Sequence, residues 1–261
     1  MTERNYKEQM VADRRWLHAH PEDGWNEFET TYFIVKRLEE LGLKALAGIE
    51  VIEPEAVMGR NEEAAQAAQA RALAHGVPEA FLKRLGGYTG AMAVLETGRP
   101  GPVTAIRVDI DSLPIEETTK PEHEANQGHF RSEYPGFSHA CGHDGHTAVG
   151  LGVAAWLADH KDSLNGTIKV LFQPAEEGVR GAAAMAAKGI VDDVDWFAGA
   201  HIGCGAYLGQ VGVSHHGYLA TTKFDLEYEG IQAAAGSPEK GRSALMCAAA
   251  TCMSPVSYTH L

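Results

Sequence analysis

Four short apolar runs that alternate with alanine-rich helical segments are the feature that most constrains the fold. Helical spacing predicts helices over 146–158 and 180–188 between the runs. Strands that alternate with helices are typical of an α/β domain. Because the runs are mostly continuous, we expect a sheet covered on both faces, with functional groups in the loops after the carboxyl ends of its strands. The runs cover residues 90–95, 103–108, 167–172 and 196–201.

The segments before these runs complete the predicted outline. Apolar residues keep helical spacing over 5–20 and 26–41, and a strand is predicted over 43–51. The stretch 61–75 is rich in Ala, Gln and Glu, which gives it strong helix propensity but only a weak apolar stripe. We therefore interpret it as an exposed helical insertion.

Composition and charge limit the possible partners. The chain has 261 residues, 44% of them hydrophobic and 22% charged, which is ordinary for one large or two small globular domains. A formal net charge of −13 disfavours nucleic acid and favours a small-molecule partner. The sequence has no run of about 18 apolar residues and no signal-peptide core, so we expect a cytoplasmic protein without a membrane partner.

The segment His139-Ala-Cys141-Gly-His143-Asp144-Gly-His146 carries the strongest chemical signal. A thiol, three imidazoles and a carboxylate fall within its eight residues. Thiolate and neutral imidazole are good ligands for zinc and similar ions, and Asp144 could orient an imidazole. The alternative is a buried cysteine among exposed histidines.

Further polar groups follow the other apolar runs. Glu176 and Glu177 are adjacent carboxylates whose repulsion a cation would relieve, and in metal-assisted hydrolysis one could be a ligand and the other a base. Asp109 and Asp111 lie on the same side of an extended chain, so both can point into one site. His201 ends the last run and could be a further ligand. The alternatives are an exposed Glu-Glu loop, two solvated aspartates and a structural histidine.

All of these groups follow strands of one α/β unit, so together they could supply nitrogen, sulfur and oxygen ligands plus a spare carboxylate. The sequence has no Gly-x-Ser-x-Gly elbow for a nucleophilic triad and no Gly-x-x-x-x-Gly-Lys-[Ser/Thr] loop for a phosphate. A thiol-dependent hydrolase that uses Cys141 is a more distant alternative. The residues themselves favour metal-assisted hydrolysis.

At these residues the chain resembles the di-metal amidohydrolases of the aminoacylase, hippurate hydrolase and indole-acetyl-amino-acid hydrolase metallopeptidase family. The shared motifs, in the family's order, are Asp109-x-Asp111-x-x-Pro114, His139 to Thr147, Gln173 to Gly178 and the strand before His201. Similarity to the branch that acts on aryl-acyl glutamates adds Arg14-Arg15-x-x-His18, Gly24-Trp25-x-Glu27-Phe28, Gly87 to Gly90 and Ala220 to Asp225.

The resemblance implies the fold and the domains. We expect a three-layer αβα catalytic domain over 1–219, like that of di-metal aminopeptidases and carboxypeptidases, and the start of an α+β lid and dimerisation domain over 220–261. An apolar helix over 238–252 fits that second domain. Both domains are expected to be incomplete, because family members return to the catalytic domain with a last metal-binding histidine, for which His260 is no convincing substitute. The implied protein partner is a second copy or a second hydrolase subunit.

The resemblance also implies the activity. It points to a metal-dependent amidohydrolase of N-acyl amino acids, with p-aminobenzoyl-glutamate, a folate breakdown product, cleaved to p-aminobenzoate and glutamate. The implied cofactor is two divalent ions, manganese or zinc. The alternatives are a metal-binding fragment without activity and a non-catalytic subunit. The implied metal ligands are Cys141, His143, Glu177 and His201, the implied general base is Glu176, and Asp111 is the carboxylate that supports the site.

Two positions bear on how a substrate would be held. Relatives carry a lid histidine that reaches the scissile carbonyl, and Ala234 stands at that position here. Loss of one oxyanion donor typically lowers the rate about 100- to 1000-fold, so we expect either another donor or a slow enzyme. Arg180 follows the glutamate pair closely enough to hold a substrate carboxylate, or to pair with Glu176 or Glu177.

Overall fold

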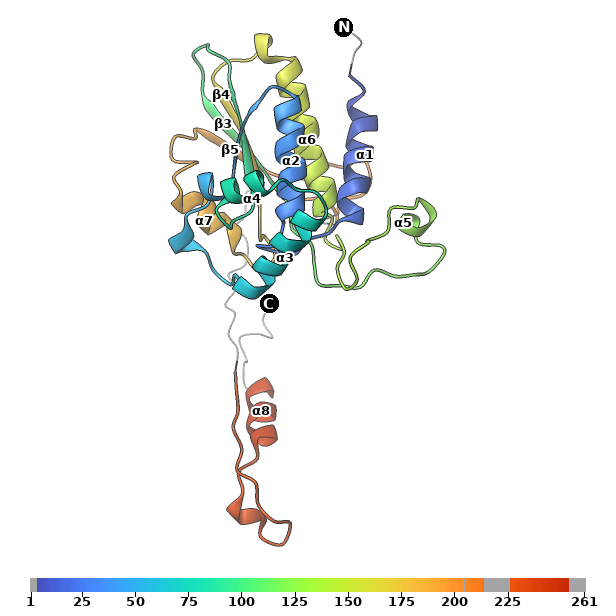
Figure 1. The fold of residues 1–261 in the computed structure, drawn as a ribbon, viewed down its shortest axis with the longest axis vertical. Coiled ribbons are helices and arrows are strands. Elements are labelled where there is room, and N and C mark those ends of the chain that lie inside the picture. Colours follow the sequence, from blue (N-terminus) through green and yellow to red (C-terminus); the bar gives the residue numbers. More distant parts are fainter. Residues whose placement is uncertain (1–3, 204, 214–225, 254–261) are drawn as a thin grey trace. The chain divides into compact units, whose positions relative to one another are not determined.

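The computed structural model describes residues 4–203, 205–213 and 226–253 (Figure 1). The chain divides into two compact units, Met1–Val213 and Ser214–Leu261. This division lies close to the domain boundary expected after residue 219, whereas the roles of the units as catalytic and lid domains stay predictions.

The first unit contains the predicted helices and strands. Its helices are α1 (Tyr6–Ala19), α2 (Phe28–Glu40), α3 (Glu62–Ala74), α4 (Glu79–Leu85), α5 (Glu124–Gln127), α6 (His143–Asp159) and α7 (Gly181–Ala187). Its strands are β1 (Lys44–Ala47), β2 (Ala91–Glu96), β3 (Val103–Asp109), β4 (Thr167–Gln173) and β5 (Trp196–Gly199). The strand predicted over 43–51 ends early, because Gly48 takes a φ of +56° and begins a short 3₁₀ turn, Gly48–Glu50. Two further 3₁₀ turns are Pro54–Ala56 and Lys161–Ser163.

The strands form one mixed sheet in the order β1-β2-β4-β3-β5. Strands β4, β3 and β5 are parallel, while β1 and β2 run antiparallel at one side. Asp109 pairs with Gln173, and Arg107 pairs with Gly199. The carboxyl ends of β3, β4 and β5 therefore meet at one edge of the sheet, where the sequence predicts the functional groups.

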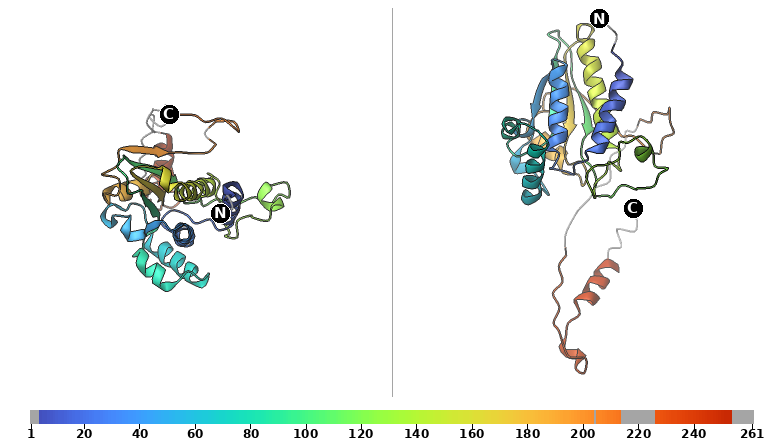
Figure 2. Two further views of the ribbon diagram at one scale, coloured as in Figure 1. Left: turned by 90° about the horizontal axis from the view of Figure 1, so that it is seen from above. Right: turned by 45° about the vertical axis from the view of Figure 1, so that its right-hand side comes forward.

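Helices cover both faces of the sheet. On one face α2 packs on β1 and β2, α6 packs on β3 and β4, and α1 lies alongside α6 (Figures 1 and 2). Helix α7 packs on β4 from the other face. Along β4, Val170 and Phe172 belong to the core under α2 and α6, whereas Leu171 belongs to the core with Trp25 and Met185. The three-layer αβα architecture is thus confirmed.

Strand β5 departs from the expectation that the sheet is covered on both faces. All four of its residues are exposed, including Trp196 at 68% and Phe197 at 56%. Strand β5 pairs with β3 on one side, and no strand of the described residues pairs with it on the other. An apolar run therefore identified the strand correctly but not its burial.

Helix α3 is confirmed, but its interpretation as an exposed insertion is wrong for one face. Ala65, Ala68 and Ala72 are buried in the core against α2. These residues recur at helical spacing, yet alanine adds so little hydrophobicity that the stripe is weak in the sequence. Small side chains nevertheless let two helices approach closely.

The second unit is described over 226–253. It contains a 3₁₀ turn, Pro238–Lys240, and helix α8 (Ala244–Met253), which buries no side chain. The predicted helix over 238–252 begins later than expected, because the Ser243 hydroxyl caps it by accepting a hydrogen bond of 3.1 Å from the Met246 amide. The shared motif over 220–225, named in the sequence analysis, lies outside the described residues. None of the described helices is long and apolar enough to cross a membrane.

Candidate metal centre

The predicted site residues meet at the sheet edge formed by β3, β4 and β5. Asp109 ends β3, the glutamate pair follows β4, and His201 follows β5. Cys141 and His143 come from the amino end of α6, where Gly142 at a φ of +102° turns the chain into the helix. A glycine at this position allows the left-handed backbone conformation that brings Cys141 next to the start of the helix.

His143 lies at the centre of the cluster. Its ring is fully buried, and its Nε2 atom lies 3.6 Å from an Asp109 oxygen, 3.8 Å from Glu176 and 3.9 Å from Glu177. Burial alone would lower the pKa of His143, but the hydrogen bond to Asp111 and the charges of Asp109, Asp111 and Glu176 raise it to about 9. Several carboxylates thus concentrate negative charge around one imidazole.

Asp111 links His143 to the glutamate loop, residues 175–179. One of its oxygens lies 3.2 Å from His143 Nδ1, and the other accepts a hydrogen bond of 2.9 Å from the Glu177 amide. Asp109 pairs with Arg107 at 2.8 Å and is hydrogen-bonded to His146 Nδ1. Both aspartates are fully buried, so the alternative of two solvated carboxylates is wrong.

The glutamate loop is held in an unusual backbone conformation. Ala175 and Val179 take φ values of +48° and +60°, on either side of Glu176, Glu177 and Gly178. A positive φ is costly for a β-branched residue and is common at functional sites. The side chains of Glu176 and Glu177 are 33% and 26% exposed, so the alternative of a fully exposed loop is wrong.

Cys141 and His201 lie at the outer side of the cluster. The Cys141 sulfur is 3.4 Å from His201 Nε2, with the cysteine half-buried and the histidine exposed. Burial and the neighbouring Glu177 and Glu176 carboxylates raise the pKa of the Cys141 thiol to about 12. His139, His143 and His146 are buried, which excludes a buried cysteine among exposed histidines.

The donor atoms fit a divalent metal ion. His143 Nε2 and Glu177 Oε1 are buried atoms without a hydrogen-bond partner in the described part of the chain. They lie 3.9 Å apart, and unpaired buried polar atoms are rare unless a water or an ion satisfies them. Three sets of ligand atoms, each within 4.8 Å of one another, share His143. The sets are Cys141, His143 and His201; Asp109, His143 and His146; and His143, Glu176 and Glu177.

Two buried residues that are not among the predicted ligands, base or supporting carboxylate also support the site. Glu27 accepts hydrogen bonds from the Ala175 amide at 2.8 Å and from the Thr89 hydroxyl, and so holds the start of the glutamate loop. Burial, and then the nearby Asp111 charge, raise the pKa of Glu27 well above its usual value. His146 Nε2 accepts a hydrogen bond of 2.9 Å from the Ile202 amide. His146 lies one helical turn after His143, in the segment that the sequence already marked as a source of ligands.

Asp144 does not orient an imidazole of the cluster as the sequence suggested. Its carboxylate instead contacts His18 Nδ1 at 2.9 Å and Arg14 at 3.1 Å. Burial opposes ionisation, but the hydrogen bond to His18 and the charges of His139 and Arg14 lower the pKa of Asp144 to about 2. Asp144 therefore ties the amino end of α6 to α1.

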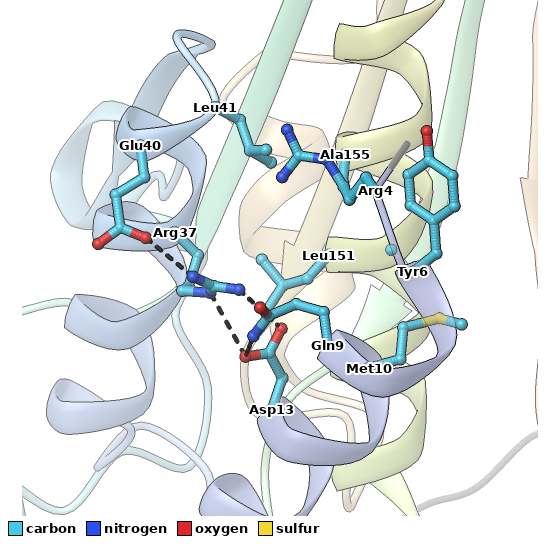
Figure 3. Close-up of a pocket in the computed structure, with 11 residues that line it drawn as sticks. Arg4, Tyr6, Gln9, Met10, Asp13, Arg37, Glu40, Leu41, Leu151 and Ala155 are labelled. Carbon is cyan, nitrogen blue, oxygen red and sulfur yellow. Dashed lines mark hydrogen bonds and ion pairs between the residues drawn. The ribbon is translucent and has the colours of Figure 1, made fainter. Parts of the chain in front are cut away.

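A separate cavity of about 60 Å³ lies among α1, α2 and α6 (Figure 3). Arg37 contacts Asp13 at 3.3 Å and Glu40 at 2.8 Å, and Arg4 contacts Asp159 at 2.8 Å. The charged groups that line the cavity are thus all paired, Arg4 with a carboxylate outside the lining. None of the predicted site residues lines it, so we assign it a structural role.

Comparison with known proteins gives a family match. The sequence profile described as Peptidase family M20/M25/M40 matches residues 105–258. In Haemophilus influenzae, the homolog of a p-aminobenzoyl-glutamate hydrolase subunit is 46% identical over 93% of this chain and 58% of its own length. The indole-3-acetyl-aspartic acid hydrolase of Enterobacter agglomerans is 47% identical over 92% of this chain and 56% of its own length.

A solved structure shares the fold. The Bacillus subtilis protein described as a dinuclear metal binding peptidase from the M20 family superposes with a TM-score of 0.56 and 32% sequence identity. The match covers 76% of this chain and 44% of that protein. The chain therefore spans less than two thirds of the length of each of these three relatives.

Proposed function

The chain belongs to peptidase family M20/M25/M40, and on that premise we propose that it is a metal-dependent amidohydrolase of N-acyl amino acids. The observation that carries the proposal is the pair of unsatisfied buried atoms, His143 Nε2 and Glu177 Oε1, beside the Glu176 carboxylate. A ligand pair next to a spare carboxylate is the arrangement that metal-assisted hydrolysis requires.

Cys141, His143, Glu177 and His201 are the proposed ligands of two divalent ions, manganese or zinc. Bound ions would lower the pKa of water and polarise the amide carbonyl. Asp111 contacts His143 Nδ1 and the Glu177 amide, so it positions two ligands at once. A carboxylate that fixes a ligating imidazole in this way raises its basicity.

Glu176 is the proposed general base. Burial, and then the charge of Asp109, raise the pKa of Glu176 above its usual value, which favours proton uptake. In the proposed reaction the Glu176 carboxylate takes a proton from the attacking water and returns it to the leaving amine nitrogen. The carbon–nitrogen bond of the amide then breaks, which leaves a carboxylic acid and an amino acid.

The proposed substrate is p-aminobenzoyl-glutamate, which would yield p-aminobenzoate and glutamate. Support comes from the Haemophilus influenzae relative, while the nearly equal similarity to an indole-3-acetyl-aspartic acid hydrolase makes that acyl amino acid the first competitor to test. The Haemophilus influenzae relative is named for one subunit of its hydrolase, which supports a second, different subunit for this chain, with a second copy as the other candidate partner. A cytoplasmic location is part of the same proposal.

The test is turnover by the purified chain after loading with manganese or, separately, zinc. Release of p-aminobenzoate from p-aminobenzoyl-glutamate is measured beside release of aspartate from indole-3-acetyl-aspartate. We expect metal-dependent release that a chelator stops. Release that a chelator leaves unchanged would contradict the proposal.

Binding without turnover is the second candidate, and Ala234 is the observation that favours it. An alanine at the expected lid position cannot donate to a developing oxyanion. A metal-loaded chain that binds p-aminobenzoyl-glutamate but releases no p-aminobenzoate, also after an Ala234→His substitution, would support this candidate over the enzyme.

A further inference from the structure

Arg180 is the residue after the glutamate loop that the proposed function leaves without a role. It directly precedes helix α7, and its backbone amide donates to the Ala175 carbonyl at 3.3 Å, which folds the loop back on itself. The side chain is therefore anchored at the same loop that supplies Glu176 and Glu177.

The guanidinium of Arg180 is held by backbone carbonyls. Nε donates to the Glu177 carbonyl at 3.0 Å, and one terminal nitrogen donates to the Gly59 carbonyl at 2.9 Å. The other terminal nitrogen lies close to Gly24. A Cβ at residue 24 would lie only 2.7 Å from this nitrogen, so a larger residue there would collide with the guanidinium. Glycines at 24 and 59 thus make room for a fixed guanidinium.

The charge of Arg180 is not paired within the described residues. Other arginines near the site have carboxylate partners: Arg107 contacts Asp109 at 2.8 Å, and Arg14 contacts Asp144 at 3.1 Å. Arg180 forms no ion pair with Glu176, Glu177 or any other described carboxylate, which rules out one of the two roles considered from the sequence. It is a half-buried, preorganised cation that is hydrogen-bonded to the backbone of the loop that carries Glu176 and Glu177.

We propose that Arg180 binds a carboxylate of the amino-acid half of the substrate. The inference rests on the proposed function, because hydrolysis of an N-acyl amino acid places a free carboxylate close to the scissile nitrogen. A guanidinium recognises a carboxylate through charge-assisted hydrogen bonds, and one already fixed in place loses little freedom on binding. Arg180 would select N-acyl amino acids that carry this free carboxylate over the corresponding neutral amides.

The experiment compares three ligands that differ in one charge. Binding of p-aminobenzoyl-glutamate, of its side-chain amide and of its α-amide is measured by titration calorimetry on the metal-loaded chain carrying Glu176→Gln, so that no ligand is consumed. Each ligand is tested with Arg180 intact and with Arg180→Gln. The matched control is Arg99→Gln, because Arg99 also donates to a backbone carbonyl, that of Leu164 at 2.7 Å, just before the amino end of β4.

We expect Arg180→Gln to weaken the binding of p-aminobenzoyl-glutamate about 10- to 100-fold. Binding of one of the two amides should be nearly unaffected, and the carboxylate that this amide lacks is the one that Arg180 binds. Metal content should be the same in all of these proteins. Arg99→Gln should bind each of the three ligands as tightly as the chain with Arg99 intact. An equal loss for all three ligands would mean that Arg180 only positions the loop, and no loss would mean that it does not contact the substrate; both overturn the inference.

Turnover by the chain with Glu176 intact distinguishes failure of this inference from failure of the proposed function. Turnover of p-aminobenzoyl-glutamate by the chain with Glu176 intact, together with an equal loss for all ligands, overturns the role of Arg180 alone. If that chain neither binds nor cleaves any of the acyl amino acids, the inference is overturned together with the proposed function.

Discussion

His143 Nδ1 and an Asp111 oxygen lie 3.2 Å apart, and both side chains are fully buried. The contact directs Nδ1 toward a carboxylate and leaves Nε2 facing Glu176 and Glu177. A histidine held in this way presents one nitrogen as a ligand, while the other is fixed by an acceptor. The contact with Asp111 therefore orients the imidazole toward the glutamate loop.

Glu176→Gln should abolish turnover and leave bound metal unchanged. Glutamine keeps the size of the side chain but cannot accept the proton, and loss of a general base typically lowers the rate about 100- to 10,000-fold. Rates and metal content are measured on the same preparations. Glu55→Gln, a change at an exposed glutamate, is the control and should have no effect. Turnover retained by Glu176→Gln would exclude Glu176 as the base.

Arg71→Met should destabilise the first unit. Arg71 on α3 contacts Glu22, which is 1% exposed, and Glu29 at 2.9 Å. Removing the cation leaves the buried Glu22 carboxylate with only the hydrogen bond from the Thr30 amide, and loss of the ion pair costs about 3 kcal/mol of unfolding free energy. Urea denaturation measures the loss.

Lys83→Met is the matched control for Arg71→Met. Lys83 pairs with Glu79 at 2.7 Å, but both side chains are largely exposed, so no measurable change is expected. Equal stability of the Arg71→Met protein and the unchanged chain would show that α3 is not held through Glu22.

Glu22 should make stability depend on pH. Burial, partly offset by Arg71, raises the pKa of Glu22 from 4.5 to about 7. The neutral form is therefore favoured in the folded chain, so the stability contributed by Glu22 is fully present below pH 4.5 and is lost as pH rises through 7. The loss amounts to about 3 kcal/mol.

Glu22→Gln isolates this effect, because glutamine cannot titrate. The difference in unfolding free energy between the unchanged and substituted chains, measured by urea denaturation at several pH values, should change between pH 4.5 and 7 and stay constant above that range. A difference that is flat across the whole range would show that Glu22 ionises at its ordinary pKa.

Val179→Asn should stabilise the fold. Val179 has a φ of +60° and is 65% exposed, so little packing is lost on substitution. Asparagine tolerates the left-handed region better than a β-branched residue, which contributes about 1 kcal/mol. Val11→Asn, at an exposed valine within α1, should instead destabilise. Thermal denaturation of both proteins distinguishes the two cases. A Val179→Asn protein that unfolds at a lower temperature than the unchanged chain would contradict the claim that Val179 is strained.

The sequence predicted the helices and strands of the first unit better than their burial and the direction of their pairing. Continuous apolar runs identified β2 to β5, because short apolar runs bounded by turn residues are typical of strands. The same runs could not distinguish the buried β4 from the exposed β5, since exposure depends on the neighbours of a strand. Likewise, the antiparallel direction of β2 is set by pairing with β4 and not by local residues.

The candidate site was predictable where chemistry is concentrated in short motifs. The cluster around His143 and the carboxylates after β3 and β4 are visible as ligand types at strand ends. Long-range partners were not visible: Glu27 reaches the Ala175 amide across 148 residues of sequence, and only the folded chain brings them together. Arg180 shows the same limit, because only the folded chain reveals that its guanidinium donates to the Glu177 and Gly59 carbonyls and does not pair with Glu176 or Glu177.

The central claim is that Cys141, His143, Glu177 and His201 bind divalent metal, and metal content per chain tests it most directly. Elemental mass spectrometry is applied after purification with added manganese and, separately, zinc. The account predicts one to two ions per chain, lost in the protein that combines Cys141→Ala and His143→Ala. A chain without bound metal, or a double variant that retains the same metal content, would contradict it.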